Sequence, residues 1–212
     1  VKSSGSASEI EIKELLARFT TDVIGTCAFG IECNSLKDPE CEFRLKGRDI
    51  LTKPRNGLIG MIFRFNFPNL ALKLHMKHTP DHIEEFFMRI VRETVELREK
   101  NNIRRNDFMD LLIDLKNNKL MKSELDEEMT NLSLEEIAAQ AFVFFTAGFE
   151  TSSTTMGFAL YELALHEDIQ HRVKQEIGEV LRRHNDVFSY EAMKEMVYLD
   201  QIISGGCGLV PY

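Results

Sequence analysis

The sequence predicts an all-α protein built around one long, buried central helix. Apolar residues recur at helical spacing along most of the 212-residue chain, and capping signals precede several of these runs. The longest run, residues 138–165, begins apolar on every face and so has no side suited to water. Almost no segment has a convincing strand pattern, and there is no repeat, glycine-rich phosphate loop or nucleophile elbow.

Composition narrows the class of protein. With 43% apolar residues, the chain belongs with globular proteins rather than disordered ones. Its net charge of −8 argues against a nucleic-acid partner, because binding phosphates requires a basic surface. Residues 1–6 are polar and lack the apolar core of a signal peptide. The cysteines form no C-x-x-C pair, so we expect the reduced thiols of an intracellular chain at Cys27, Cys33, Cys41 and Cys207.

The N-terminal third of the chain predicts two helices separated by a loop. Ser8 and Glu11 have the spacing of a capping box, and apolar residues then follow at helical spacing as far as residues 25–30. Residues 34–39 have the composition of a loop. We expect a second, modest helix over residues 42–52.

Residues 58–70 form an ambiguous apolar segment. Phe63, Phe65 and Phe67 alternate with polar residues, and alternation of this kind favours a strand, as an edge segment, or a buried loop. The segment is far too short and too charged to span a bilayer.

Two further helices are expected before the central one. Thr79 is predicted to cap the first, with Pro80 in its first turn. Its predicted buried stripe consists of Ile83, Phe86, Phe87, Ile90, Val91, Thr94 and Leu97. A shorter helix begins at Asp107, and the polar residues 116–131 after it predict a solvated loop.

Three histidines near this region, His75, His78 and His82, have a spacing that could suit a metal ion. Pro80 interrupts the helical register between them, so we favour solvated histidines instead. The sequence therefore predicts no metal site there.

The C-terminal third predicts a charged amphipathic helix and shorter elements after it. The helix covers residues 168–184, and its inward positions are Ile169, Val173, Ile177, Val180 and Leu181. Ser189 is expected to cap a short turn with Ala192 and Met196, and one more helix begins near residue 198.

The central helix carries the features that favour chemistry. Ser133 and Glu136 form a capping box at its start. Within the apolar run lie a glycine that weakens a helix by about 1 kcal/mol, a carboxylate that is costly to bury, and several hydroxyls. At 100° per residue, the side chains of Ala147, Gly148 and Thr151 share one face, and Val143 and Phe144 continue it one turn earlier.

Two structural interpretations of this helix compete with a catalytic one. The first is a packing helix, in which Gly148 permits a close contact and Glu150 pairs with a basic residue. The second is a transmembrane helix over residues 137–161, where Glu150 is the single charge. The acid-rich, capped start and the many hydroxyls favour a globular core over a membrane span.

The run Ala147-Gly148-Phe149-Glu150-Thr151 resembles the oxygen-binding motif of cytochrome P450 monooxygenases, commonly written A/G-G-x-D/E-T-T/S. Residues 19–30 and 166–177 also resemble the family in order and spacing. The resemblance is greatest to the microsomal, xenobiotic-metabolising type, especially that of insects. It implies that residues 1–204 are the middle helical portion of the P450 fold and that residues 205–212 are a divergent, glycine-rich tail.

The resemblance also implies a role for each residue of the motif. In the family this helix lies across one face of a haem, and the acid and the threonine help to deliver protons during oxygen activation. Here those two catalytic residues would be Glu150 and Thr151. The haem-facing residues would be Ala147, Gly148 and Thr151, and the substrate pocket would be lined by Val143, Phe144 and Thr146.

The same resemblance implies partners and a location. The substrate would be a lipophilic small molecule, and electrons would come from NADPH through NADPH–cytochrome P450 reductase. The protein would lie at the endoplasmic reticulum membrane. Residues 58–70 would be the region between two lid helices, and this region would cover the substrate pocket and dip into the membrane surface.

Two family motifs are absent from these 212 residues. The E-x-x-R pair is replaced by residues 205–208, and the haem-thiolate loop F-x-x-G-x-R-x-C-x-G, which carries the axial cysteine, does not occur. Cys207 is a poor substitute ligand, because it lies among glycines without a following helix. We therefore expect a fragment that is inactive by itself. The alternative is a non-catalytic, truncated helical product without haem, which acts, if at all, through partner or membrane-surface contacts.

Overall fold

The computed structural model describes residues 11–53, 55, 57–77, 79–117 and 132–209. These residues form helices joined by turns, and none of them forms a strand, which confirms the all-α prediction. The chain divides into two compact units, one formed by Ala17–Glu150 and the other by Val1–Leu16 with Thr151–Tyr212. Each unit has its own buried core.

The first helix, α1, covers Ile12–Ile24 and continues into a π-helical turn, η1, over Gly25–Phe29. Gly30 ends the turn in the left-handed region with a φ of 67°, a conformation that glycine adopts without strain. This end agrees with the prediction, while the expected capping residue Ser8 lies outside the described residues. Cys27, Cys33 and Cys41 are free thiols, and burial raises the pKa of Cys33 to about 12.

The second helix, α2, covers Glu42–Thr52 as predicted. The next segment corrects the sequence analysis, because Gly57–Asn66 forms α3 and Pro68–Lys73 forms α4, where alternation favoured a strand or a loop. The alternating phenylalanines also satisfy the helical spacing of four residues: the ring centroids of Phe63 and Phe67 lie 5.4 Å apart. Three alternating positions are too few to distinguish the two periods.

Helix α5 covers Asp81–Asn101. Pro80 occupies the N-cap position, so Thr79 is not the cap that the sequence predicted. The buried stripe is correct at most positions, but Leu97 is wrong: its side chain is 56% exposed, and Val95 and Arg98 are buried instead.

Helix α6 covers Phe108–Lys116 and begins as predicted, since the side chain of Asp107 accepts a hydrogen bond from the backbone N–H of Asp110. The loop expected over residues 116–131 lies largely outside the described residues. His78 does too, and His82 lies 3.5 Å from Asp49. Among the described residues, no group of three His, Cys, Asp or Glu side chains is placed to hold a metal ion.

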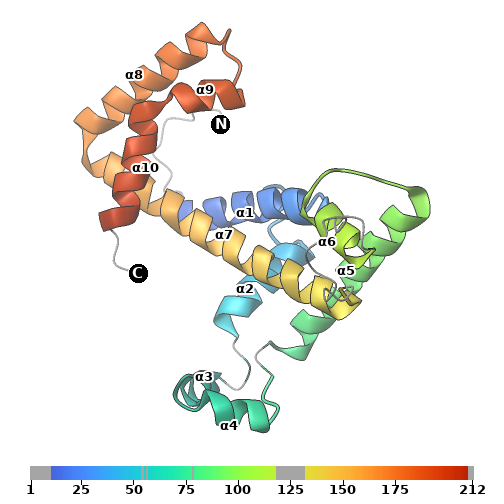
Figure 1. Ribbon diagram of the computed structural model, residues 1–212. Coiled ribbons are helices and arrows are strands. Elements are labelled where there is room, and N and C mark those ends of the chain that lie inside the picture. The colour runs from blue at the N-terminus through green and yellow to red at the C-terminus, as the bar shows by residue number, and fades with distance from the viewer. Residues whose placement is uncertain (1–10, 54, 56, 78, 118–131, 210–212) are drawn as a thin grey trace, which may run out of the picture. The chain divides into compact units, whose positions relative to one another are not determined.

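The core of the Ala17–Glu150 unit is an aromatic cluster on one side of helix α7, which covers Leu134–Leu165. The ring of Phe145 lies 5.7 Å from that of Phe43 in α2 and 5.3 Å from that of Phe87 in α5. Phe29 of η1 and Phe149 of α7 also belong to the cluster. Such tilted and edge-to-face pairs contribute about 0.5–1.5 kcal/mol each beyond their area. In this unit α2 and α5 therefore pack against α7, which is one long helix in Figure 1.

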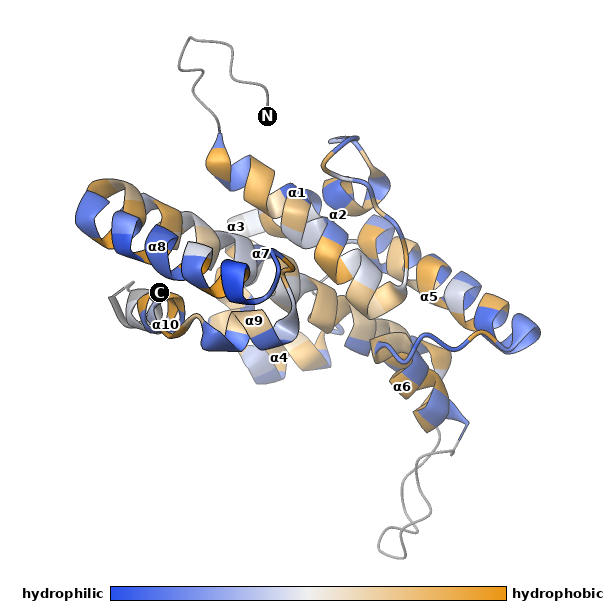
Figure 2. Cartoon of the chain, turned by 90° about the horizontal axis from the view of Figure 1, so that it is seen from above, coloured by the Kyte–Doolittle hydropathy of each residue, from blue (hydrophilic) through white to orange (hydrophobic). Residues whose placement is uncertain are grey.

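In the other unit, α8 covers Glu167–Arg183, α9 covers Tyr190–Glu195 and α10 covers Val197–Leu209. Helix α8 separates hydrophilic from hydrophobic residues along its length (Figure 2). The predicted cap is confirmed: Ser189 Oγ accepts from the N–H of Ala192 at 3.1 Å, and Val180, Ala192 and Met196 form the small core. The carboxylate of Glu176 accepts from the first two N–H groups of α10 beyond Val197. Helix α10 continues through Gly205 to Leu209, so the glycine-rich tail begins as helix.

Candidate functional site

Helix α7 runs without interruption through the motif that the sequence analysis singled out. Its capping box is confirmed. The N–H of Glu136 donates to Ser133 Oγ at 3.2 Å, and the N–H of Ser133 donates to the Glu136 carboxylate at 2.8 Å. Among the described residues, no helix, α7 included, is long and apolar enough to cross a membrane.

The expectation that α7 is buried on every face is wrong. Ile137, Ala141, Phe145 and Phe149 are buried, but on the opposite side the side chains of the next group lie in the open: Gln140, Val143, Phe144, Ala147 and Thr151. Val143 is 60% exposed although it is fully apolar. The described helices of the Ala17–Glu150 unit cover one side of α7. The other side, which we call the open face, is exposed except where Phe144 stacks on Phe108 of α6. Its members are those five residues.

Gly148 does not belong to the open face. A Cβ atom built on it would lie 2.5 Å from Cδ1 and 3.1 Å from Cγ1 of Ile24 in α1. Real side chains do not make contacts this short, so the space that Gly148 leaves is filled by Ile24. The sequence showed that something approaches Gly148 closely, but the neighbour in this structure is another helix.

The two residues predicted to be catalytic lie side by side in the helix. Glu150 is partly buried, and Thr151 is exposed. Ala147 lies four residues before Thr151, so their side chains are neighbours on the helix surface. The structure thus brings an acid, a hydroxyl and a methyl group together at one place along α7.

The predicted pocket residues differ in their surroundings. Val143 points into the open, whereas the ring of Phe144 stacks on that of Phe108 in α6, with centroids 4.3 Å apart. The hydroxyl of Thr146 is buried and has no hydrogen-bond partner among the described residues. An orphaned hydroxyl is costly in a finished core, so Thr146 marks a place where a further polar contact would stabilise the helix.

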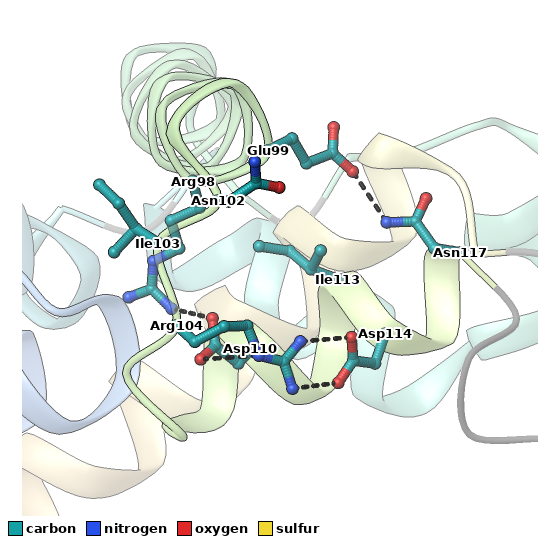
Figure 3. Close-up of a pocket in the computed structure, with 9 residues that line it drawn as sticks. All are labelled: Arg98, Glu99, Asn102, Ile103, Arg104, Asp110, Ile113, Asp114 and Asn117. Atoms are coloured by element: carbon teal, nitrogen blue, oxygen red, sulfur yellow. Dashed lines mark hydrogen bonds and ion pairs between the residues drawn. The ribbon is translucent and has the colours of Figure 1, made fainter.

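A second candidate is a charged pocket of about 690 Å³ between the end of α5 and α6 (Figure 3). Arg98 is 4% exposed in its side chain and donates to Asp107 and Asp110 at 2.6 Å each. Arg104 holds the Asp114 carboxylate with two bonds of 2.6 and 2.7 Å, and Glu99 accepts from Asn117 at 2.9 Å.

The charges in this pocket already pair with one another. Burial raises the pKa of Asp110, but backbone N–H donors of Arg105 and Asn106 and the Arg98 guanidinium outweigh it, so the pKa lies below its usual value. We therefore treat the group formed by Arg98, Arg104, Asp107, Asp110 and Asp114 as a structural charged cluster rather than a ligand site. Sequence reasoning missed it, although the aspartates recur at helical spacing.

Comparisons with known proteins agree on one family. The family described as Cytochrome P450 matches residues 1–204. Cytochrome P450 6a9 of Drosophila melanogaster is 67% identical over 195 residues, which cover 92% of this chain and 38% of that protein. Cytochrome P450 6a8 of the same species is 55% identical over 196 residues, covering 92% of the chain and 39% of that protein. Cytochrome P450 6A1 of Musca domestica is 50% identical over 199 residues, covering 93% and 38%. The chain thus spans about two fifths of the length of these relatives.

Proposed function

Because the chain belongs to the cytochrome P450 family, we propose that it is the middle helical portion of a haem-thiolate monooxygenase. The reaction would insert one oxygen atom of O₂ into a lipophilic small molecule. One observation carries the proposal: α7 presents Ala147 and Thr151 side by side on its open face, with Glu150 next to them in the helix.

The open face suits a flat, largely apolar cofactor. Its residues near the motif are small or uncharged, and Ala147 lets a large ring approach the helix backbone closely. Val143 and Phe144 of this face are also 60% and 40% exposed, so their apolar side chains need a further contact to leave water. We propose that Ala147 and Thr151 contact haem, and that Gly148 contributes by letting α1 support the helix from behind.

Haem, when bound, would supply the oxygen-activating chemistry, and the chain would supply positioning and protons. Thr151 has a hydroxyl that both donates and accepts, so it can hold a water molecule at the open face. Glu150 is partly buried, so it can exchange a proton with solvent and pass it to that water. Val143 and Phe144 would orient the lipophilic substrate, and the hydroxyl of Thr146, which has no hydrogen-bond partner among the described residues, would bind a polar group nearby.

A membrane-surface contact is proposed for α3 and α4. Three of their apolar side chains are highly exposed: Ile59 at 83%, Phe65 at 79% and Leu72 at 75%. Exposed apolar side chains on short helices are typical of segments that lie in the surface of a bilayer. This contact supports a location at the endoplasmic reticulum membrane, where NADPH–cytochrome P450 reductase would deliver electrons.

The alternative proposal is a non-catalytic helical product that binds no haem. The same uncovered apolar residues favour it, because a protein partner could cover them as well as a cofactor. Titration of the purified chain with hemin separates the two: a Soret band with a thiolate-type carbon monoxide shift would show catalytic competence of the chain by itself. No band would leave catalysis to a longer protein.

The experiment for the longer protein is a chimera in which residues 1–204 replace the matching segment of Cytochrome P450 6a9. We expect the chimera to bind haem and to oxidise a lipophilic test substrate such as a 7-alkoxycoumarin. Thr151→Ala should then lower the ratio of product formed to NADPH consumed by about tenfold, because the water held by the hydroxyl is lost. Val143→Ala, which leaves the hydroxyl in place, is the matched control. Equal ratios in Thr151→Ala and the unmodified chimera would overturn the role of Thr151.

A further inference from the structure

Helix α1 buries two polar residues while it exposes apolar ones. Its apolar residues Phe19 and Val23 are exposed, whereas Thr20 and Thr21 are buried together with Ile24. A helix that exposes its phenylalanine and buries two threonines is not held in place by apolar burial alone. The buried threonines must therefore find polar partners.

Thr20 finds its partner in α7. Its hydroxyl lies 2.8 Å from the backbone carbonyl oxygen of Phe149 and donates to it. The same hydroxyl lies 3.2 Å from the carbonyl oxygen of Ala17, but that oxygen already accepts from the hydroxyl of Thr21 at 2.7 Å. A hydroxyl has one proton to donate, so the shorter contact across the two helices takes it.

This contact falls at a sensitive position of α7. In a regular helix the carbonyl of Phe149 accepts from the N–H four residues later, so Thr20 adds a second donor to one rung of the helix. A side chain that inserts into this hydrogen-bond ladder sets the local direction of the helix. The residue that follows Phe149 is Glu150, and Thr151 comes next.

A second contact lies next to the first. Ile24 is four residues after Thr20, so both side chains project from one face of α1. Ile24 fills the space at Gly148, while Thr20 holds the carbonyl of Phe149. One contact is steric and the other is directional, and together they resist both sliding and rotation of α7 at these two consecutive residues.

We infer that Thr20 and Ile24 are positioning residues that fix the rotation of the turn carrying Glu150 and Thr151. This inference rests on the proposed function for its consequence in catalysis, but the contact itself is independent of haem. Without the hydroxyl of Thr20, the turn loses its directional anchor, and the acid and the hydroxyl no longer keep a single orientation on α7.

The test compares Thr20→Val, which removes the hydroxyl but keeps the shape, with Thr20→Ser, which restores the donor. Thr21→Val is the matched control, because Thr21 donates within its own helix. In the 212-residue chain we expect Thr20→Val to speed amide hydrogen exchange in residues 147–153 about fivefold, with exchange in α5 and α6 unchanged. Thr20→Ser and Thr21→Val should leave residues 147–153 as in the wild type.

The chimera described above supplies the catalytic measurement. Thr20→Val should lower the ratio of product to NADPH consumed while the KM for substrate stays the same, and Thr20→Ser should restore the ratio. Equal exchange in Thr20→Val and Thr21→Val, or an unchanged ratio in an active chimera, would overturn the inference. An inactive chimera would count against the proposed function alone, since the exchange measurement decides the positioning role by itself.

Discussion

In the charged cluster between α5 and α6 the charged side chains pair with one another, whereas the open face of α7 leaves apolar side chains exposed. In the cluster, Arg98 meets two carboxylates and the carbonyl oxygen of Phe29, so a buried charge has partners on several sides. On the open face, Val143 and Ala147 remain exposed although they are apolar. The cluster satisfies its own groups and therefore holds the fold. The open face instead leaves apolar side chains such as Val143 exposed, and this difference directs the search for a ligand to α7 rather than to the charged pocket.

The largest effect on the free energy of unfolding is expected from a change at Arg98. Arg98→Met would remove the buried cation from Asp107 and Asp110 and release the carbonyl of Phe29. Among the described residues, these two carboxylates would keep only longer ion-pair contacts, to Arg105 at 3.7 Å and to Arg104 at 3.9 Å. Removing one partner of a buried ion pair costs about 3–5 kcal/mol, so we expect the free energy of unfolding to fall by that amount. Urea unfolding followed by circular dichroism measures it.

Arg89→Met is the matched control for Arg98→Met. Arg89 pairs with Glu42 at 2.8 Å, but both side chains are about half exposed, so this pair should contribute little. The structural role of the cluster would be contradicted by equal losses of stability in the two variants.

The second prediction concerns the buried side of α7, where Gly148 faces Ile24 of α1. Gly148→Ala places a methyl group against Ile24. Overpacking of this kind costs about 1–3 kcal/mol, and the better helix propensity of alanine offsets about 1 kcal/mol of it. Combining it with Ile24→Ala removes the clash, so the double variant should be more stable than the sum of the two single changes indicates. The free energies of unfolding of the four proteins in this cycle measure the coupling.

Gly178→Ala tests whether the effect belongs to the contact rather than to glycine. Gly178 lies within α8, and a Cβ atom there would meet nothing within 4 Å. Alanine is the better helix former by about 1 kcal/mol, so this variant should be more stable than the wild type. A loss of stability in Gly178→Ala, or additivity of Gly148→Ala with Ile24→Ala, would contradict the close approach of α1.

The fold follows from local sequence signals where those signals act within one element. The bounds of α2, the start of α6 at Asp107 and the caps at Ser133 and Ser189 depend on neighbours a few residues away, and the prediction was confirmed at each. Residues 58–70 were predicted wrongly because a short apolar run satisfies the strand and the helix period alike.

The surroundings of the candidate site and of the charged cluster depend on contacts between residues far apart in the sequence, and local sequence signals could not predict these contacts. Periodicity placed Leu97 inside and could not place Arg98, because the carboxylates that make its burial favourable belong to another helix. The sequence likewise showed a small residue at Gly148 without showing that Ile24 fills the space. The sequence of one segment predicts where a helix forms and which residues are polar, whereas packing against other helices decides which face is buried.

The smallest expected effect lies on the open face itself. Val143→Asn replaces an apolar side chain that is 60% exposed, and surface changes of this kind alter the free energy of unfolding by about 0.5 kcal/mol or less. Binding of an apolar fluorescent dye to the chain should fall, because the exposed apolar area of the face is reduced. Val95→Asn in α5, where the valine is buried, is the control and should unfold the protein at lower urea. If instead Val143→Asn destabilised the chain as much as Val95→Asn, the face would already be covered in solution, and α7 would have no free surface to offer a cofactor.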